Sequence, residues 1–218
     1  MLILELFAGS RSIGKIAEIM GHHVFSVDIE PFEGIDLVID IEDLEAEKML
    51  LYPDMVWASP PCTTYSIAGI STHRDNQTPK SDFAHKSDRL VIKTLEIIKE
   101  FNCIYYIENP VCMLRKMDFM RELPRATVTY CSYGDNRMKP TDIWSNNIRS
   151  LFNIDGWTPR PMCFNGNPFC HNDRAPRGSK TGTQGLKTDY DRSKIPQELC
   201  KEIIIATDKV LTKSLTIK

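Results

Sequence analysis

A cysteine and a glutamate each stand at the end of a short apolar run in this sequence. Cys62 follows the run 54–58 across Ser59-Pro60-Pro61, and Glu108 follows the run Cys103–Ile107. Open α/β sheets carry their reactive groups at the carboxyl ends of such buried strands. A pyrimidine ring becomes reactive at C5 when a thiolate adds to C6 while an acid engages N3. The order and placement of the pair therefore predict covalent chemistry on a pyrimidine base.

The surroundings of both residues fit this chemistry, although each also has a purely structural interpretation. Two prolines would hold the Cys62 thiol at a fixed angle, and the amide groups of a helical turn after it would favour the thiolate. The alternative is a buried, unreactive cysteine. Burial of Glu108 would favour its protonated form, which can donate to ring N3, with Asn109 orienting it. The alternative is a glutamate that caps the next helix.

A glycine-containing segment from Phe7 to Gly14 joins a predicted strand to a predicted helix. Glycines let the backbone approach a ligand closely. Nucleotide sites of this kind place an acid at the end of the second strand, about 20 residues on, and Asp28 lies nineteen residues after Gly9. Asp40 ends a third strand and can accept from an adenine amino group. NAD, FAD and S-adenosylmethionine sites share this pattern, and a plain tight turn is the structural alternative.

Two cations, Arg137 and Lys139, alternate in an extended segment after Tyr133-Gly134, so their side chains point the same way. They are candidates for contact with the O2 atom of a cytosine or with a phosphate. Ordinary surface charge is the alternative.

The elements that must position these residues alternate between strand and helix. Apolar runs predict strands at 2–6, 23–27, 36–39, 54–58, 103–107, 126–130 and 141–144, and helices at 15–20, 90–101 and from Ile195-Pro196 onward. This alternation predicts the α/β class, with a doubly wound, mostly parallel seven-stranded sheet. Residues 67–86 are polar and predict a long loop, of the kind that is either a functional lid or disordered.

The chain divides into three predicted parts. Residues 1–147 form the catalytic and cofactor-binding domain, 148–193 a small irregular subdomain rich in Gly, Pro, Asn and Arg, and 194–218 a helix that packs back on the first part. The net charge is −2, but the segment 160–194 holds seven Lys and Arg against three Asp, which leaves −6 on the remainder. Such a basic segment suits a phosphate backbone, and a solvated polar loop is the alternative.

Composition restricts the class of protein further. With 218 residues, 42% hydrophobic and 26% charged, the chain suits one packed domain with a small appendage. No apolar run approaches the roughly 18 residues of a membrane span, and the first residues become polar too soon for a signal peptide. Seven cysteines without a regular spacing predict reduced thiols in a cytoplasm.

The grouping of Cys163, Cys170 and His171 is the pattern closest to a metal site. Three ligands at irregular spacing fall short of the usual four, and Cys131 would complete the set only if the fold brought it close. We therefore predict no metal.

Taken in order, these motifs resemble those of DNA cytosine-5 methyltransferases, in particular the small enzymes that phages encode. The resemblance runs from residue 2 to about 145 and is carried by Glu5-Leu6-Phe7-Ala8-Gly9, Val27-Asp28-Ile29, Asp40-Ile41, Pro61-Cys62, Glu108-Asn109-Pro110 and Asn136-Arg137-Met138-Lys139. Three features depart from the family pattern. Arg11 stands near the usual second loop glycine, Lys139 replaces an arginine, and Arg192-Ser193-Lys194-Ile195-Pro196 takes the place of a Gly-Asn-Ser-Val motif.

The resemblance implies a Rossmann-like methyltransferase fold and S-adenosyl-L-methionine as cofactor. The residues that it assigns to the cofactor are Phe7, Ala8, Gly9, Ser10, Arg11, Gly14, Asp28, Ile29, Asp40, Ile41 and Pro60. It also implies that a cytosine is flipped out of double-stranded DNA. Cys62 then adds to C6, Glu108 engages N3, and Arg137 with Lys139 steadies the O2 side. The resemblance also implies that residues 148–193 are a small target-recognition region and that residues 67–86 close over the base as a lid. Predicted DNA contacts are Ser66, Arg74, Arg177, Lys180 and Gln184.

Several alternatives and expectations accompany this interpretation. The same chemistry would serve RNA or a free cytidine nucleotide, and a binding protein without activity is a second alternative, although it would need neither Cys62 nor Glu108. A nicotinamide oxidoreductase would leave Pro60-Pro61-Cys62 unexplained, whereas Arg11 leaves room for a modified methyl donor. We expect a monomer without a membrane partner, in the cytoplasm of a bacterial host if a phage encodes it, as in restriction-modification systems.

Overall fold

The computed structural model describes residues 1–164, 167, 186 and 188–216. Its main sheet has the order β3-β2-β1-β4-β7-β9-β8. The strands are β1 (Leu2–Leu6), β2 (His23–Asp28), β3 (Leu37–Val38), β4 (Met55–Ala58), β7 (Ile104–Pro110), β8 (Arg125–Thr129) and β9 (Pro140–Ser145). β9 runs antiparallel to both of its neighbours, and the pairs from β3 to β7 are parallel. The predicted mostly parallel seven-stranded sheet is confirmed.

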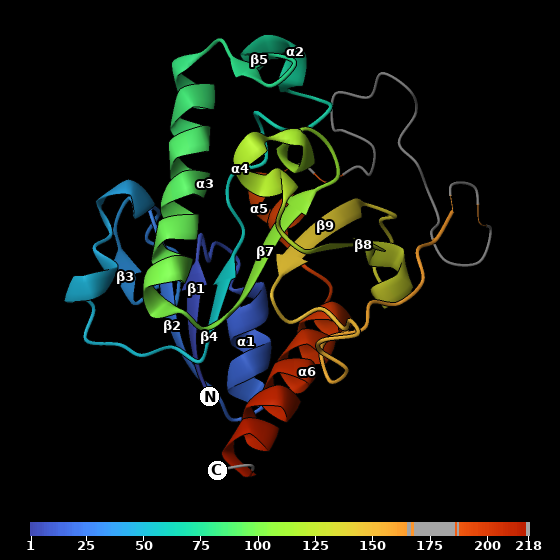
Figure 1. The fold of residues 1–218 in the computed structure, drawn as a ribbon. Coiled ribbons are helices and arrows are strands. Elements are labelled where there is room, and N and C mark those ends of the chain that lie inside the picture. Colours follow the sequence, from blue (N-terminus) through green and yellow to red (C-terminus); the bar gives the residue numbers. More distant parts are fainter. Residues whose placement is uncertain (165–166, 168–185, 187, 217–218) are drawn as a thin grey trace.

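Helices cover both faces of this sheet, which makes a three-layered molecule (Figure 1). The long helix α3 (Asp82–Phe101) and the short α4 (Asp118–Arg121) pack on one face, against a core that includes Leu4, Val56 and Ile107. The helices α1 (Ser12–Ile19) and α6 (Gln197–Thr216) pack on the other. The predicted C-terminal helix therefore does pack back on the sheet.

The strand order reverses between β1 and β4, so the chain leaves these two strands toward opposite faces. Open α/β sheets bind ligands beside such a reversal, at the carboxyl ends of the strands. In Figure 1 those ends point upward, where α2 (Ile70–His73) and α5 (Asp189–Ser193) also lie. The candidate site must therefore be sought at this edge.

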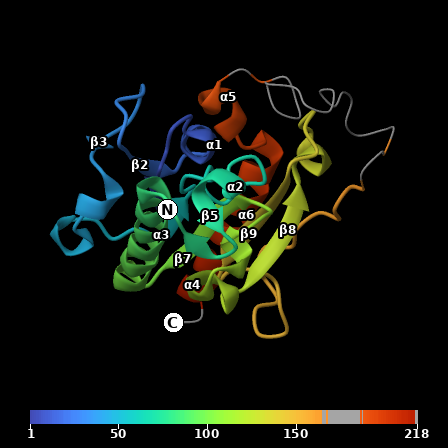
Figure 2. The ribbon, with the colours of Figure 1, turned by 90° about the horizontal axis from the view of Figure 1, so that it is seen from above.

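The segment predicted as a loop over 67–86 carries regular structure instead. It contains α2, a two-stranded hairpin of β5 (Arg74–Asp75) and β6 (Thr78–Pro79), and the first turn of α3. α3 begins eight residues earlier than predicted because Ser81 caps it, its Oγ accepting from the amide of Ala84 at 3.2 Å. Viewed from above, α2 and β5 lie over the upper end of the sheet (Figure 2).

Four short 3₁₀ helices complete the described structure: η1 (Ile41–Asp43), η2 (Ala46–Lys48), η3 (Leu114–Lys116) and η4 (Tyr130–Tyr133). Of the predicted subdomain 148–193, residues 165–166, 168–185 and 187 lie outside the described residues. Its first part packs on the sheet, where the ring of Trp157 is buried and meets Tyr106 edge-on at 6.3 Å. Within the ranges that the structure describes, no helix has the length and apolar character to cross a membrane.

Candidate active site

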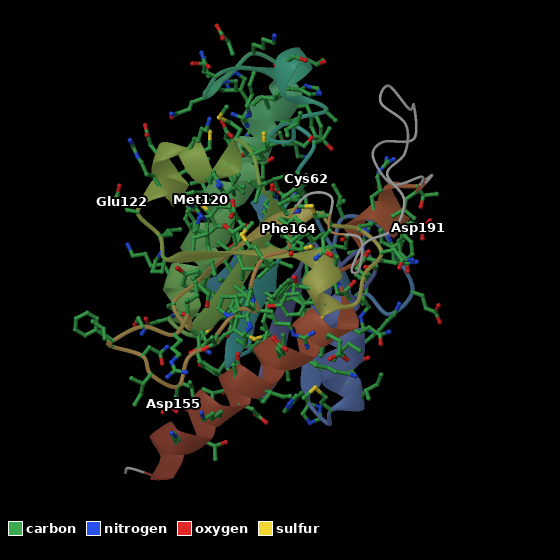
Figure 3. The ribbon with its side chains drawn as sticks, turned by 90° about the vertical axis from the view of Figure 1, so that its right-hand side faces the viewer. Cys62, Met120, Glu122, Asp155, Phe164 and Asp191 are labelled. Atoms are coloured by element: carbon green, nitrogen blue, oxygen red, sulfur yellow. The ribbon has the colours of Figure 1, made fainter. Side chains whose placement is uncertain are left out.

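The segment that carries Cys62 and the strand that carries Glu108 lie side by side. β4 and β7 are parallel neighbours, and their register aligns Ala58 with Ile107. Just past that pair, Asn109 Nδ2 donates to the carbonyl oxygen of Pro60 at 2.9 Å. The fold thus brings together the two motifs that the sequence placed at strand ends. Figure 3 shows Cys62 in the upper half of the view, well above Asp155.

A tight turn begins at Cys62, as predicted. Its carbonyl oxygen accepts from the amides of Tyr65 at 3.0 Å and Ser66 at 2.9 Å. Tyr65 is fully buried and donates through its hydroxyl to Asp88 on α3, at 2.6 Å. The turn that carries the thiol is therefore anchored to the long helix rather than to a loose loop.

Arg74, predicted to contact DNA, lies inside the protein instead. Its side chain is fully buried, pairs with Asp88 at 2.5 Å and stacks on the ring of Tyr65 with 4.3 Å between the guanidinium carbon and the ring centre. It also donates to the carbonyl oxygen of Thr64 at 3.0 Å. Burying a charge in this way requires such a partner, and it leaves the guanidinium unable to reach a phosphate. We therefore withdraw Arg74 as a DNA contact.

Glu108 is 5% exposed, in keeping with the predicted burial. Its Oε1 atom accepts from the hydroxyl of Tyr130 at 2.8 Å and lies 3.7 Å from Lys139 Nζ. The Lys139 ammonium also faces the ring of Tyr130, 4.6 Å from its centre, and its backbone φ is +22°. Glu108 and Lys139 thus lie close together, and Tyr130 is a neighbour of both that the sequence analysis missed.

Arg137 is close to this group, but its five N–H donors are all engaged. Two bonds reach Asp135, from Nε at 2.8 Å and from Nη2 at 2.6 Å. Three more reach backbone carbonyl oxygens of Asp191, Arg192 and Lys194, at 3.4, 3.1 and 2.8 Å. A guanidinium has no further hydrogen to give. The expectation that Arg137 steadies a base must be revised, because in this structure it holds the segment around α5 to the sheet.

The loop from Phe7 to Gly9 is built to approach a ligand. Phe7 and Gly9 have backbone φ angles of +54° and +47°, a conformation that residues other than glycine rarely adopt. The Gly9 amide donates to Asp28 Oδ2 at 2.8 Å, and the Glu30 amide donates to Oδ1 at 2.9 Å. Beside them, Ile29 presents an apolar side chain that is 55% exposed. This arrangement offers a carboxylate for sugar hydroxyl groups and an apolar contact for a base, which are the contacts that a nucleoside requires.

Beneath this loop, Gly14 makes room for the side chain of Glu5. A Cβ atom at Gly14 would lie 2.5 Å from Glu5 Oε2, so a larger residue would force this carboxyl group to move. Glu5 accepts from the Gly14 amide at 3.3 Å and from the Ser26 hydroxyl at 3.0 Å. Burial raises the pKa of Glu5 to about 7, against the lowering effect of these hydrogen bonds. Gly14 therefore contributes to the site by close packing.

The side chain of Arg11 points away from the loop surface. It is buried, donates from Nε to Ser26 Oγ at 3.0 Å and forms an ion pair with Glu18. Its guanidinium also fills the space beside Gly34, where an added Cβ would lie 2.7 Å away. With a φ of +53°, Arg11 keeps the backbone turn that a loop glycine would make. Its side chain is therefore a structural link between α1 and β2 and does not face a cofactor.

Asp40 and Ile41 lie at the start of η1. Asp40 Oδ1 caps this helix by accepting from the Glu42 amide at 3.1 Å, and Oδ2 pairs with Lys86 on α3 at 2.6 Å. The hydrogen bond from Lys86 lowers the pKa of the Asp40 carboxyl below its usual value. The side chain of Ile41 is buried in the core. Asp40 therefore stays a charged acceptor at this edge.

A cavity of about 590 Å³ opens between the start of α1 and the start of α6. It is lined by Ser10, Ser12, Lys15, Tyr190, Lys194 and Gln197, among others. Ser12 Oγ also accepts from the amide of Ile195 at 3.1 Å, which joins the two sides. The cavity extends from the loop 7–14 to the segment 192–196, which stands in place of the Gly-Asn-Ser-Val motif.

The remaining predicted site residues either make few contacts or lie outside the described residues. Ser66 is half-buried and donates to the carbonyl oxygen of Thr63 at 3.2 Å, while Ala8, Ser10 and Pro60 are buried at the same edge. Arg177, Lys180 and Gln184 lie outside the described residues, as do Cys170 and His171. The described part of the chain contains no cluster of three or more His, Cys, Asp or Glu suited to a metal ion.

Comparison with known proteins identifies the family of this chain. Residues 2–133 match the model of the C-5 cytosine-specific DNA methylase family. A frog virus 3 protein (isolate Goorha), described as a probable DNA (cytosine-5)-methyltransferase, is 30% identical over 198 residues, which cover 87% of this chain and 86% of the relative. The chain belongs to the C-5 cytosine-specific DNA methylase family. The prediction of a DNA cytosine-5 methyltransferase is thereby confirmed at the level of the family.

A solved structure shows the same fold. It is described as a proposed DNA modification methyltransferase encoded within a prophage of E. coli, and it superimposes with a TM-score of 0.51 at 16% sequence identity. The match covers 66% of this chain and 46% of that chain, so this chain spans about half the length of the solved protein.

Proposed function

We propose that this chain methylates C5 of cytosine in double-stranded DNA through a covalent bond between Cys62 and C6. The observation that carries the proposal is the hydrogen bond from Asn109 to Pro60, which sets the Cys62 turn beside the strand of Glu108. A nucleophile and an acid are thus supplied from neighbouring strands to one ring. Cys62 and Glu108 have no shared task in a binding protein, so their juxtaposition favours an enzyme.

The residues of the loop suit S-adenosylmethionine. Asp28 keeps lone pairs for ribose hydroxyls beyond its two backbone bonds, Ile29 offers an apolar face for adenine, and Asp40 is a charged acceptor for the adenine amino group. The serine-lined cavity beside Lys15 and Lys194 suits the amino-acid end. When bound, S-adenosylmethionine supplies the electrophilic methyl group that C5 attacks.

The chain's own residues would act in sequence on the flipped base. The Cys62 thiolate forms the S–C6 bond, and the electrons of the ring double bond move toward C5 while Glu108 donates its proton toward N3. Lys139 is the cation that remains for the O2 side, because the donors of Arg137 are engaged. Loss of the C5 proton to solvent then restores the double bond and releases the Cys62 thiolate.

Nucleoside mass spectrometry tests the proposal. The purified protein is incubated with S-adenosylmethionine and unmodified mixed-sequence DNA, alongside RNA and dCMP, with Cys62→Ala as the control. We expect 5-methylcytosine in DNA from the wild type and none from the variant. Product from RNA or dCMP alone would support the proposed reaction but show that double-stranded DNA is not its substrate. Absence of product from all three substrates, with the cofactor bound, would refute the proposal.

A further inference from the structure

Tyr130 is a buried tyrosine in the candidate site that the steps above leave without a role. It is the first residue of η4, directly after β8, and none of its surface is exposed. Its side chain extends to Glu108, twenty-two residues away in the sequence. A buried hydroxyl group needs a hydrogen-bond partner, and any acceptor would satisfy it. Tyr130 donates to the one carboxylate on which the proposed chemistry depends.

The contacts of the Glu108 carboxylate are unevenly shared between its two oxygens. The Tyr130 hydroxyl donates to Oε1 at 2.8 Å, and Lys139 Nζ lies 3.7 Å from the same atom. Over the part of the chain that the structure describes, neither contact involves Oε2. Oε2 is therefore the oxygen that these two contacts leave available to donate to N3, as the proposed function requires of Glu108. The oxygen that remains for a base is therefore fixed by Tyr130.

The ring of Tyr130 also organises the cations of the site. Lys139 Nζ lies 4.6 Å and the Arg137 guanidinium carbon 5.4 Å from the ring centre. A cation over an aromatic face at these distances is attracted to it. Burial raises the pKa of Tyr130 well above its usual value, so the hydroxyl keeps its hydrogen. One side chain thus touches the acid and both cations.

We infer that Tyr130 is a positioning residue for methyl transfer: its hydroxyl fixes Glu108 so that the protonated Oε2 faces cytosine N3, and its ring locates Lys139. The inference rests on the proposed function. In this role Tyr130 orients the Glu108 carboxyl group and makes no direct contact with the base. Removing the hydroxyl alone should slow the step that Glu108 assists and leave the binding of DNA and cofactor intact.

Tyr130→Phe is the variant that separates these roles, because phenylalanine keeps the ring and its cation contacts. We expect kcat to fall about 10- to 100-fold, as for a misoriented catalytic group, with the KM for DNA within about twofold of wild type. A second readout is the release of tritium from DNA labelled at cytosine C5, without cofactor. Exchange needs only addition of Cys62 and engagement of N3, so it should slow by a similar factor.

Tyr106→Phe is the matched control, a fully buried tyrosine on β7. The Tyr106 hydroxyl accepts from Asn147 Nδ2 at 2.9 Å and lies 3.1 Å from the Thr207 hydroxyl, away from the site. We expect Tyr106→Phe to keep the wild-type kcat and exchange rate. Wild-type kcat in Tyr130→Phe, or an equal loss in both variants, would overturn the inference while the proposed function stands. A wild-type protein that yields no 5-methylcytosine would overturn both.

Discussion

Asn109 and Pro60 are joined by a buried 2.9 Å hydrogen bond that connects the two strand ends of the candidate site. Asn109 is 1% exposed, and its Nδ2 reaches from the end of β7 to the carbonyl oxygen two residues before Cys62. The amide therefore sets the separation between the thiol-bearing turn and the Glu108 carboxylate. A group that fixes the relative position of two reacting side chains affects rate more than binding.

Asn109→Ala should therefore lower both stability and rate. We expect a loss of about 1–3 kcal/mol in the free energy of unfolding, because the Pro60 carbonyl loses its partner. Single-turnover methylation should slow about 10- to 100-fold as the strand ends shift. Asn147→Ala is the control: Asn147 is equally buried and donates to the Tyr106 hydroxyl at 2.9 Å, away from the site. If both variants slow methylation equally, Asn109 has only a structural role.

The sheet could be predicted from the sequence because its strands are apolar runs that end in polar or turn residues. Each of the seven expected strands is present, and β7 extends to Pro110. The start of α3 was missed, although Ser81-Asp82 is a recognisable helix N-terminus with a capping hydroxyl and an acid in the first turn. The polar composition of residues 67–86 pointed to a loop, so the start of the helix at Ser81-Asp82 was not recognised.

The positions of the arginines could not be predicted in the same way. Arg11, Arg74 and Arg137 were each expected to face a ligand, yet each is buried and paired with an acid. A sequence shows that a residue is charged but does not show which acid the fold places beside it. Arg74 and Asp88 are fourteen residues apart, and Tyr130 and Glu108 are separated by β9 in the sheet. Contacts of this kind depend on the finished fold.

The stability of the protein should depend on pH through Glu5. Its pKa is raised from 4.5 to about 7 in the folded state, so folding favours the protonated form. The stability that this proton gives is complete below about pH 4.5 and is lost as pH rises through about 7, by as much as about 3 kcal/mol. Glu5→Gln, which is neutral throughout, removes this loss.

Urea unfolding at pH 5 and pH 8 measures the effect. We expect Glu5→Gln to match the wild type closely at pH 5 and to be more stable than it at pH 8. The Gln side chain keeps an acceptor for the Gly14 amide and can donate to Ser26 Oγ, so the packing is retained. A difference between the two proteins that is the same at both pH values would show that Glu5 does not titrate in this range.

Arg74→Met should destabilise the protein without changing its electrostatic contact with DNA. Removing the guanidinium leaves Asp88 mostly buried and uncompensated, which costs about 3–5 kcal/mol in comparable pairs. Adding Asp88→Asn should recover part of this loss, since Tyr65 can still donate to the amide oxygen. The slope of log affinity against log salt should equal that of the wild type. A slope reduced by about one would restore Arg74 as a phosphate contact.

Substitution of Arg137 should mainly affect stability, whereas substitution of Lys139 should mainly affect the rate of methylation. Arg137→Lys replaces five fixed donors by three, so it should lower the free energy of unfolding by about 1–3 kcal/mol and loosen the segment 191–194. Lys139→Gln loses a 3.3 Å bond to the Arg192 carbonyl oxygen, the 3.7 Å ion pair with Glu108 and the contact with the Tyr130 ring, so its free energy of unfolding should fall by about 1 kcal/mol. Its kcat should fall about tenfold, because the base loses the cation on its O2 side. Urea unfolding and single-turnover methylation measure the two effects. A Lys139→Gln variant with wild-type kcat, or an Arg137→Lys variant that is slow but fully stable, would reverse the two assignments.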